Sequence, residues 1–83
     1  MELKPVQSSQ IAALGYDAGT QTLAVRFHPT AAQKKEGKPG STYAYRNVAP
    51  GDATRLREAE SIGSHFIKFI KADPKSFPFT KLD

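Results

Sequence analysis

Basic residues and tyrosines in the middle of the chain have the types and spacing to bind a phosphate-bearing ligand. Two arginines flank a lysine-bearing segment of residues 30–40, and two tyrosines follow that segment. Lysine and arginine neutralise phosphate groups, and an exposed tyrosine ring offers a face for a nucleobase, each stack contributing about 1 to 3 kcal/mol. We therefore expect a ligand-binding site made of Arg26, Lys34, Lys35, Lys38, Tyr43, Tyr45 and Arg46.

Each part of this site has a structural alternative. Tyr43 and Tyr45 are two positions apart and share one face of a strand, so their rings either stack on a ligand or enter the core. In the core they would lie across from Phe27 and Val25. A domain of this size seldom leaves large aromatic side chains exposed, which favours the core. The cations, in turn, can form an ordinary solvated surface.

Catalytic and metal sites have little support in the residue types present. The only imidazole bases are His28 and His65, and no serine lies in the Gly-x-Ser-x-Gly context of a hydrolase nucleophile. Cysteine is absent, which excludes thiolate metal sites, and two isolated histidines give no recognisable ligand spacing. We expect a non-catalytic protein that uses neither a metal nor another cofactor.

Length, charge and hydropathy set the class of protein. Eighty-three residues suffice for one domain, taken as 1–83, and a net charge of +4 favours anionic partners. No apolar run approaches the about 20 residues of a membrane span. The absence of cysteine is typical of a reducing compartment, so we expect a cytoplasmic protein without a membrane partner.

Three strands are predicted to position the candidate residues. An apolar run followed by an Asp-Ala-Gly-Thr turn places one strand at about 10–17, and an alternating pattern places the next at 21–28. The third, at 41–48, returns antiparallel to the second. Residues 30–40 contain no large apolar side chain, so we predict a flexible basic loop that brings its lysines toward the strand arginines.

Two short helices are predicted to cover one face of this three-stranded antiparallel meander, giving an α+β fold. Pro50 begins the first helix, and Ser61 or Ser64 caps the second. The C-terminal segment 77–82 is too apolar for a free tail, and we expect it to pack on the body or pair with a sheet edge. The expected buried centre is Leu23, Val25, Phe27, Leu56, Phe66 and Ile70.

Short motifs occur in a fixed order along the chain, namely Ser8-Ser9, Gly15-Tyr16-Asp17, Tyr43-x-Tyr45-x-x-Val48 and Ser61-x-Gly63 with Phe66. In this order and spacing they resemble the KTSC domain, a small module named for the C-terminus of some lysyl-tRNA synthetases. The similarity runs from about residue 6 to 79, which implies a stand-alone member. The family has no established activity and has been suggested to bind RNA. In the family a tight Gly-containing turn usually joins the second and third strands, whereas residues 30–40 form a longer insertion here.

Two classes of function agree with these features. In the first, a non-catalytic module binds RNA, another single-stranded nucleic acid or a nucleotide through the basic hairpin. In the alternative, an exposed sheet edge or the apolar C-terminal segment pairs with a second copy or with another protein, a host protein if the gene is carried by a phage. The chain has more aromatic residues than so small a domain can bury, so we expect a homo-oligomer.

Overall fold

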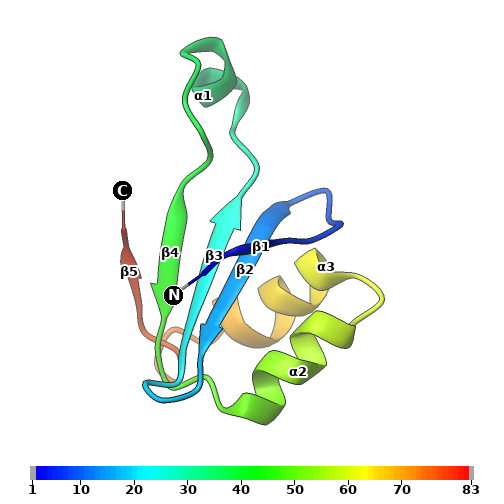
Figure 1. Ribbon diagram of the computed structural model, residues 1–83, viewed down its shortest axis with the longest axis vertical. Coiled ribbons are helices and arrows are strands. Elements are labelled where there is room, and N and C mark those ends of the chain that lie inside the picture. The colour runs from blue at the N-terminus through cyan, green and yellow to red at the C-terminus, as the bar shows by residue number, and fades with distance from the viewer. Residues whose placement is uncertain (1, 83) are drawn as a thin grey trace.

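The sheet of this protein has five strands, two more than the sequence predicts, and helices cover one of its faces (Figure 1). The computed structural model describes residues 2–82. The α+β class is confirmed. The prediction of three strands is wrong because the two added strands are two and three residues long, too short to show a hydrophobic period. Neighbouring strands are antiparallel and follow chain order: β1 (Lys4–Pro5), β2 (Ile11–Asp17), β3 (Thr22–Phe27), β4 (Thr42–Tyr45) and β5 (Phe79–Lys81).

The hairpin of β2 and β3 is the centre of the sheet. An Asx turn connects the two strands, in which Asp17 Oδ1 accepts a hydrogen bond from the Gly19 N–H at 3.0 Å. Leu14 lies opposite Val25, and both side chains are buried. The alternation of the sequence therefore directs one face of the hairpin into the core, as predicted.

β4 is shorter than the predicted strand 41–48, and its register differs from the expected one. Tyr43 lies opposite Val25, and Tyr45 lies opposite Leu23. The expected partners, Phe27 and Val25, are therefore displaced by two residues. The strand ends at Tyr45 because the backbone enters the left-handed region two residues later, which interrupts the ladder.

The C-terminal segment pairs with a sheet edge, which confirms one of the two expected outcomes for it. β5 lies against β4, with Phe79 opposite Tyr45 and Lys81 opposite Tyr43. Backbone hydrogen bonds extend the pairing beyond the strand, since the Leu82 N–H donates to the carbonyl oxygen of Thr42 at 2.9 Å. This pairing brings an apolar segment from the end of the chain beside the two tyrosines.

The helical layer consists of α2 (Pro50–Glu58), α3 (Ile62–Phe66) and a π-helical turn, η1 (Ile67–Lys71), that continues α3. Ser61 caps α3 by accepting a hydrogen bond from the Ser64 N–H at 3.3 Å, as expected of a serine before a helix. In the described part of the chain no helix is long and apolar enough to cross a membrane.

Phe66 lies at the centre of the core, with 0% of its surface exposed. Its ring meets those of Tyr45 and Phe27 edge-on, at centroid distances of 5.1 and 5.7 Å. The predicted buried centre is confirmed except for Phe27, which is only partly buried. The core also includes Ile11, Leu14, Tyr45, Val48 and Ala53.

Motif residues from opposite ends of the chain meet where α3 packs on the turn before β2. Ser8 Oγ accepts hydrogen bonds from the N–H groups of Gln10 and Ile11, both at 3.2 Å. A Cβ atom on Gly63 would lie 2.8 Å from Gln10 Oε1 and 3.1 Å from Ser8 Oγ. Glycine therefore allows the helix to approach this turn, and these motif residues have a structural role.

Residues 28–41 form an arm that projects beyond the sheet (Figure 1). In place of the predicted loop, the arm contains a five-residue helix, α1 (Ala31–Lys35), none of whose side chains is buried. Thr30 Oγ1 accepts a hydrogen bond from the Gln33 N–H at 3.2 Å, and Gln33 Oε1 accepts one from the Thr30 N–H at 2.9 Å. The Thr-Ala-Ala-Gln sequence is thus a capping box, a signal that the lack of apolar residues obscured.

Candidate ligand-binding groove

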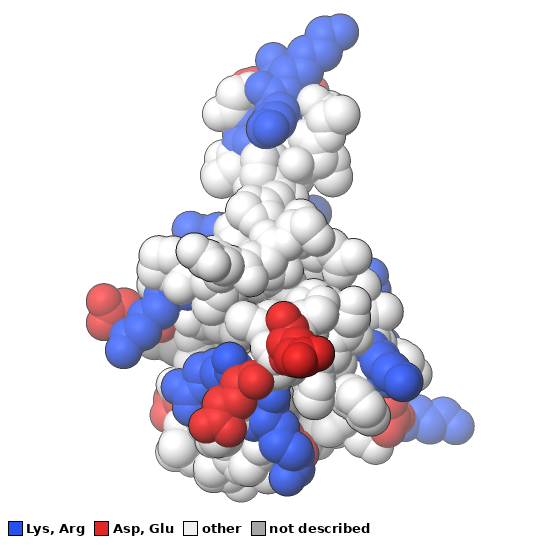
Figure 2. All heavy atoms as spheres, turned by 90° about the vertical axis from the view of Figure 1, so that its right-hand side faces the viewer, with Lys and Arg blue, Asp and Glu red and all other residues white. Residues whose placement is uncertain are grey.

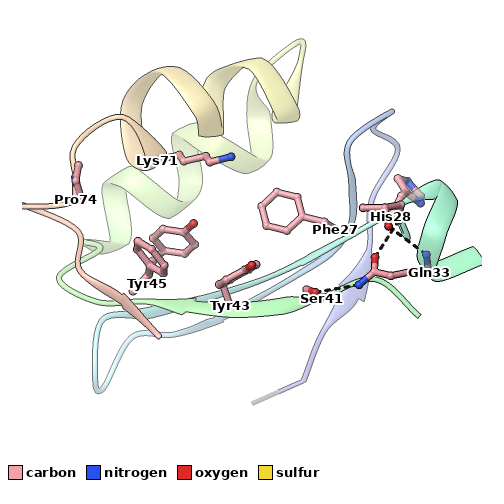
Figure 3. A pocket seen from close by; sticks show the side chains of 10 residues that line it. Phe27, His28, Gln33, Ser41, Tyr43, Tyr45, Lys71 and Pro74 are labelled. Atoms are coloured by element: carbon pink, nitrogen blue, oxygen red, sulfur yellow. Dashed lines mark hydrogen bonds between the residues drawn. The ribbon is translucent and has the colours of Figure 1, made fainter. Parts of the chain in front are cut away.

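A groove with a cavity volume of about 390 Å³ lies between β4 and the end of the helical layer, at the foot of the arm (Figure 3). Figure 3 shows Tyr43 and Tyr45 on the sheet side and Lys71 on the helix side, with Pro74 toward one end and Gln33 toward the other. The lining combines aromatic rings with polar groups and one cation. Its residues are Phe27, His28, Thr30, Gln33, Ser41, Tyr43, Tyr45, Lys71, Pro74 and Phe79.

The aromatic rings of the groove form a connected cluster with one well exposed member. Phe79 meets Tyr43 edge-on at 5.8 Å between ring centroids and lies tilted by 34° against Tyr45 at 5.5 Å. Tyr45 is 4% exposed and Tyr43 is partly buried, whereas Phe79 is 54% exposed. Tyr45 therefore belongs to the core, as the structural alternative holds, and the ring surface open to a ligand is chiefly that of Phe79.

Burial also determines the charge state of Tyr45, which lines the groove. Desolvation raises the pKa of Tyr45 above its ordinary value of 10.0, and the neighbouring Tyr43 raises this pKa further. Tyr45 is therefore a neutral phenol at physiological pH and adds no negative charge to the groove. None of the described residues that line the groove is acidic, so the site is suited to an anion rather than a cation.

Polar groups at the arm end of the groove are held by hydrogen bonds. His28 Nε2 lies 2.8 Å from the carbonyl oxygen of Ser8. Because a carbonyl can only accept, His28 Nε2 carries the proton, which leaves Nδ1 as an acceptor in the neutral ring. Gln33 Nε2 donates to Ser41 Oγ at 3.2 Å, and Figure 3 shows this bond at the arm end. These contacts connect α1 to the rim of the groove.

Lys71 supplies the positive charge of the groove. It ends the π-helical turn η1, which buries Ile70 on the core side and leaves Lys71 exposed. Its side chain extends over the groove in Figure 3. Within residues 2–82 it forms no ion pair with a carboxylate. π-Helical turns often occur at functional sites, and this one directs an unpaired cation toward exposed aromatic surface.

The structure brings together only part of the predicted site. Tyr43 and Tyr45 line the groove, and the lysines of the arm, Lys34, Lys35 and Lys38, follow directly from its rim. Figure 2 shows Lys and Arg side chains gathered at the tip of the arm, whereas on the body they alternate with acidic ones. Lys38 Nζ lies 3.3 Å from Glu36 Oε2, and both side chains are exposed. The attraction within this surface ion pair is therefore weak.

The two arginines lie away from the groove. Arg26 alternates with Val25 and Phe27 along β3 and so lies on the sheet face opposite the helices, where its Nε donates to Thr42 Oγ1 at 2.9 Å. Arg46 follows β4 at the end remote from the arm and is exposed. The expected convergence of all the cations on one end of the hairpin is therefore not found.

The residues that sequence reasoning missed come from elements that meet only in the folded chain. Lys71 and Phe79 lie in the C-terminal third, and only the pairing of β5 with β4 brings Phe79 beside the tyrosines. The apolar character of segment 77–82 was the one available signal. His28 and Ser41 carry no motif of their own, and Gln33 belongs to the capping box of α1, which gives no sign of a ligand site. Within the described residues, no cluster of three or more side chains has the composition of a metal site.

Comparison with known proteins agrees with this fold. The pattern of the KTSC domain matches residues 7–73. A crystal structure of a KTSC domain protein from Yersinia pestis superimposes with a TM-score of 0.78 and 28% sequence identity, over 99% of this chain and 97% of that chain. The similarity thus covers the sheet and the helical layer together.

Two relatives of similar size and one much larger protein are similar to this chain in sequence. An uncharacterised protein of Stutzerimonas stutzeri is 32% identical over 83 residues, the whole of both chains. A protein of Tsukamurella paurometabola is 41% identical over 69 residues, which are 83% of this chain and 88% of that one. A lysine–tRNA ligase of Nostoc punctiforme is 38% identical over 80 residues, 96% of this chain and 12% of the ligase. Because the family pattern spans most of its length, the chain belongs to the KTSC domain family.

Proposed function

We propose that this protein is a non-catalytic module that binds single-stranded RNA, single-stranded DNA or a nucleotide. The observation that carries the proposal is the presence in one groove of an exposed Phe79 ring and of Lys71, which forms no ion pair within residues 2–82, at the foot of an arm with three lysines. The groove offers apolar surface for a base, and the cations offer charge for phosphates. The similarity to part of a lysine–tRNA ligase is in keeping with an RNA ligand.

The distribution of charge determines how the ligand is held. Exposed lysines act on phosphates through counterion release, so each contact adds to affinity and to its salt dependence. Aromatic stacking adds about 1 to 3 kcal/mol per base and is nearly independent of salt. Binding should therefore weaken steeply with salt and retain a smaller component that depends on the base.

The test is fluorescence anisotropy of a labelled single-stranded RNA of about 12 nucleotides over a salt series. Replacing Lys34, Lys35 and Lys38 by Gln should lower the affinity and flatten the salt slope by up to about three phosphate contacts. The matched control replaces three exposed cations that do not line the groove, Lys4, Arg57 and Lys68, by Gln. Absence of binding by the wild type at low salt, or an unchanged slope in the arm variant, contradicts the proposal.

A second candidate function is association with another chain through the edge of the sheet. Among the strands of residues 2–82, β5 pairs with β4 alone, and Phe79 and Leu82 are 54% and 58% exposed. The Leu82 N–H donates to β4, so by strand alternation the backbone groups of Lys81 point to the free edge. A second copy can add a strand there. Light scattering at about 100 μM protein tests this, since a dimer weaker than that gains only about 5 kcal/mol, and a monomer mass contradicts it.

A further inference from the structure

The arrangement of rings in the groove limits how many bases it can hold. Proteins that bind a run of stacked bases present successive exposed ring faces along the strand. Here the rings of Phe27 and Tyr43 meet at 73°, and those of Tyr43 and Phe79 at 75°. In each of these two pairs the edge of one ring therefore meets the face of the other, and of the rings in the groove Phe79 is the one with a large exposed surface. The groove has one stacking platform, not a series.

The residues at the two ends of the groove also indicate that it holds a single base. Pro74 lies toward one end and Gln33, bonded to Ser41, toward the other (Figure 3). A strand running the length of the groove would meet both. A volume of about 390 Å³ is near the lower limit of the about 300–1,000 Å³ typical of small-molecule sites, which suits one nucleotide. The chain of a longer ligand must enter and leave over the open side.

The positions of the lysines are suited to holding one nucleotide in the groove. Lys71 extends over the groove, while the arm lysines begin one residue beyond Gln33, outside it. A base against Phe79 thus has a cation beside it for its own phosphate, and further cations for the backbone that leaves the groove. His28 lines the arm end of the groove and is held there by the contact of its Nε2 with the Ser8 carbonyl oxygen.

We propose that the groove is a pocket for one unstacked nucleotide, with Phe79 as the stacking platform and Lys71 as the phosphate ligand. This inference rests on the proposed function and adds to it the unit of recognition. A free mononucleotide should then bind in the same place as one nucleotide of RNA. The arm lysines contribute affinity for the rest of the strand without regard to its bases.

The test compares oligomers of equal length and charge. An abasic ribose phosphate oligomer with one adenine in its middle should bind almost as tightly as the corresponding oligoadenylate, and an entirely abasic oligomer about tenfold or more weaker, as one stack contributes. AMP should compete for the groove and quench tyrosine fluorescence. This signal is specific because the protein has no tryptophan, and two of its three tyrosines line the groove.

Substitutions test the roles given to Phe79 and Lys71. Phe79→Ala should abolish the difference between one-adenine and abasic oligomers, and Phe79→Tyr should restore it. Phe69→Ala, which removes a ring of equal exposure outside the groove, should leave the difference unchanged. Lys71→Gln should weaken AMP binding severalfold, whereas Lys68→Gln, on the same turn, should not. Circular dichroism confirms that each variant is folded.

The outcomes separate the inference from the proposed function. If affinity rises with every added base, or if Phe79→Ala leaves the base dependence intact, nucleic-acid binding stands and the single-nucleotide pocket is overturned. If the wild type binds no oligomer and no AMP at low salt, both are overturned. If AMP binds with unchanged affinity to the Lys71→Gln variant, the role given to Lys71 is wrong.

Discussion

The helices α1 and α3 have the same length and the same kind of cap, yet they are stabilised by different forces. Each has five residues, and in each a hydroxyl oxygen, of Thr30 or Ser61, accepts a hydrogen bond from the N–H three residues later. α3 buries Phe66 completely, whereas α1 buries nothing. Helices this short are unstable alone, so α3 depends on the core and α1 on its cap and on the arm. We therefore expect the body to unfold cooperatively and the arm to rearrange while the body stays folded.

The largest effect is expected from removing the side chain that distinguishes α3. Phe66→Ala should lower the free energy of unfolding by about 3 to 5 kcal/mol, because it empties the space between Tyr45 and Phe27. In a domain of this size that loss is comparable to the total stability. Urea or thermal unfolding followed by circular dichroism measures it.

The control for Phe66→Ala is Phe69→Ala, three residues along the same helical segment. Phe69 is 55% exposed and contacts His65 and Lys68 at the surface. Its removal should cost less than about 1 kcal/mol. Equal destabilisation by the two variants would contradict the central position given to Phe66.

The next largest effect is expected where the arm joins the body. Gly40 is buried, and a Cβ atom there would lie 1.8 Å from the carbonyl oxygen of Phe27. Gly40→Ala must therefore displace the backbone, at a cost of about 1 to 3 kcal/mol. Gly51→Ala is the control, since the nearest atom to its Cβ is 3.8 Å away on the Arg55 side chain. It should be neutral or slightly stabilising. An unchanged melting temperature for Gly40→Ala would show that the junction is not rigid.

The sequence predicts the elements that have a local hydrophobic period, and it misses those that depend on their surroundings or on a cap. The alternation in β3 and the apolar positions of α2 and α3 follow from local periodicity, and these elements agree with the structure. β1 and β5 exist only because a longer neighbour offers them an edge, and α1 exists because of a cap rather than an apolar face. Short elements defined by their surroundings leave no periodic signal in the chain.

The candidate site was predictable to a smaller extent. Residue type and spacing single out the tyrosines and the arm lysines as candidates for stacking and phosphate binding, and the structure places Tyr43 and Tyr45 in the groove. Arg26 and Arg46 were placed wrongly, since a strand's alternation sends Arg26 to the opposite face and the length of β4 separates Arg46 from the arm. Lys71 and Phe79 reach the groove through tertiary packing, which residue spacing does not reveal.

The third prediction concerns the pH dependence of the body. The pKa of Tyr45 is raised above 10.0 by burial and by Tyr43, so the folded chain holds this proton more tightly than the unfolded chain does. The stabilisation that comes from keeping Tyr45 protonated is fully present below pH 10. It is lost as the pH rises through the raised pKa of Tyr45 in the folded chain. Denaturant unfolding at a series of pH values should show stability falling above about pH 10. In Tyr45→Phe this fall should be smaller, and an unchanged slope would contradict the assignment to Tyr45.

The smallest global effect is expected from the cap of α1, and it tests the comparison of the two helices most directly. Thr30→Ala removes a capping oxygen and should destabilise α1 by about 1 kcal/mol. Because α1 buries no side chain, this loss should appear as faster amide hydrogen exchange within residues 31–35 while the free energy of global unfolding changes by less than about 0.5 kcal/mol. Ser61→Ala removes the equivalent cap from α3, where the helix is part of the core, and should lower global stability by about 1 kcal/mol. If Thr30→Ala lowers global stability as much as Ser61→Ala does, the arm unfolds together with the body, and its lysines cannot reorganise around a ligand independently of the fold.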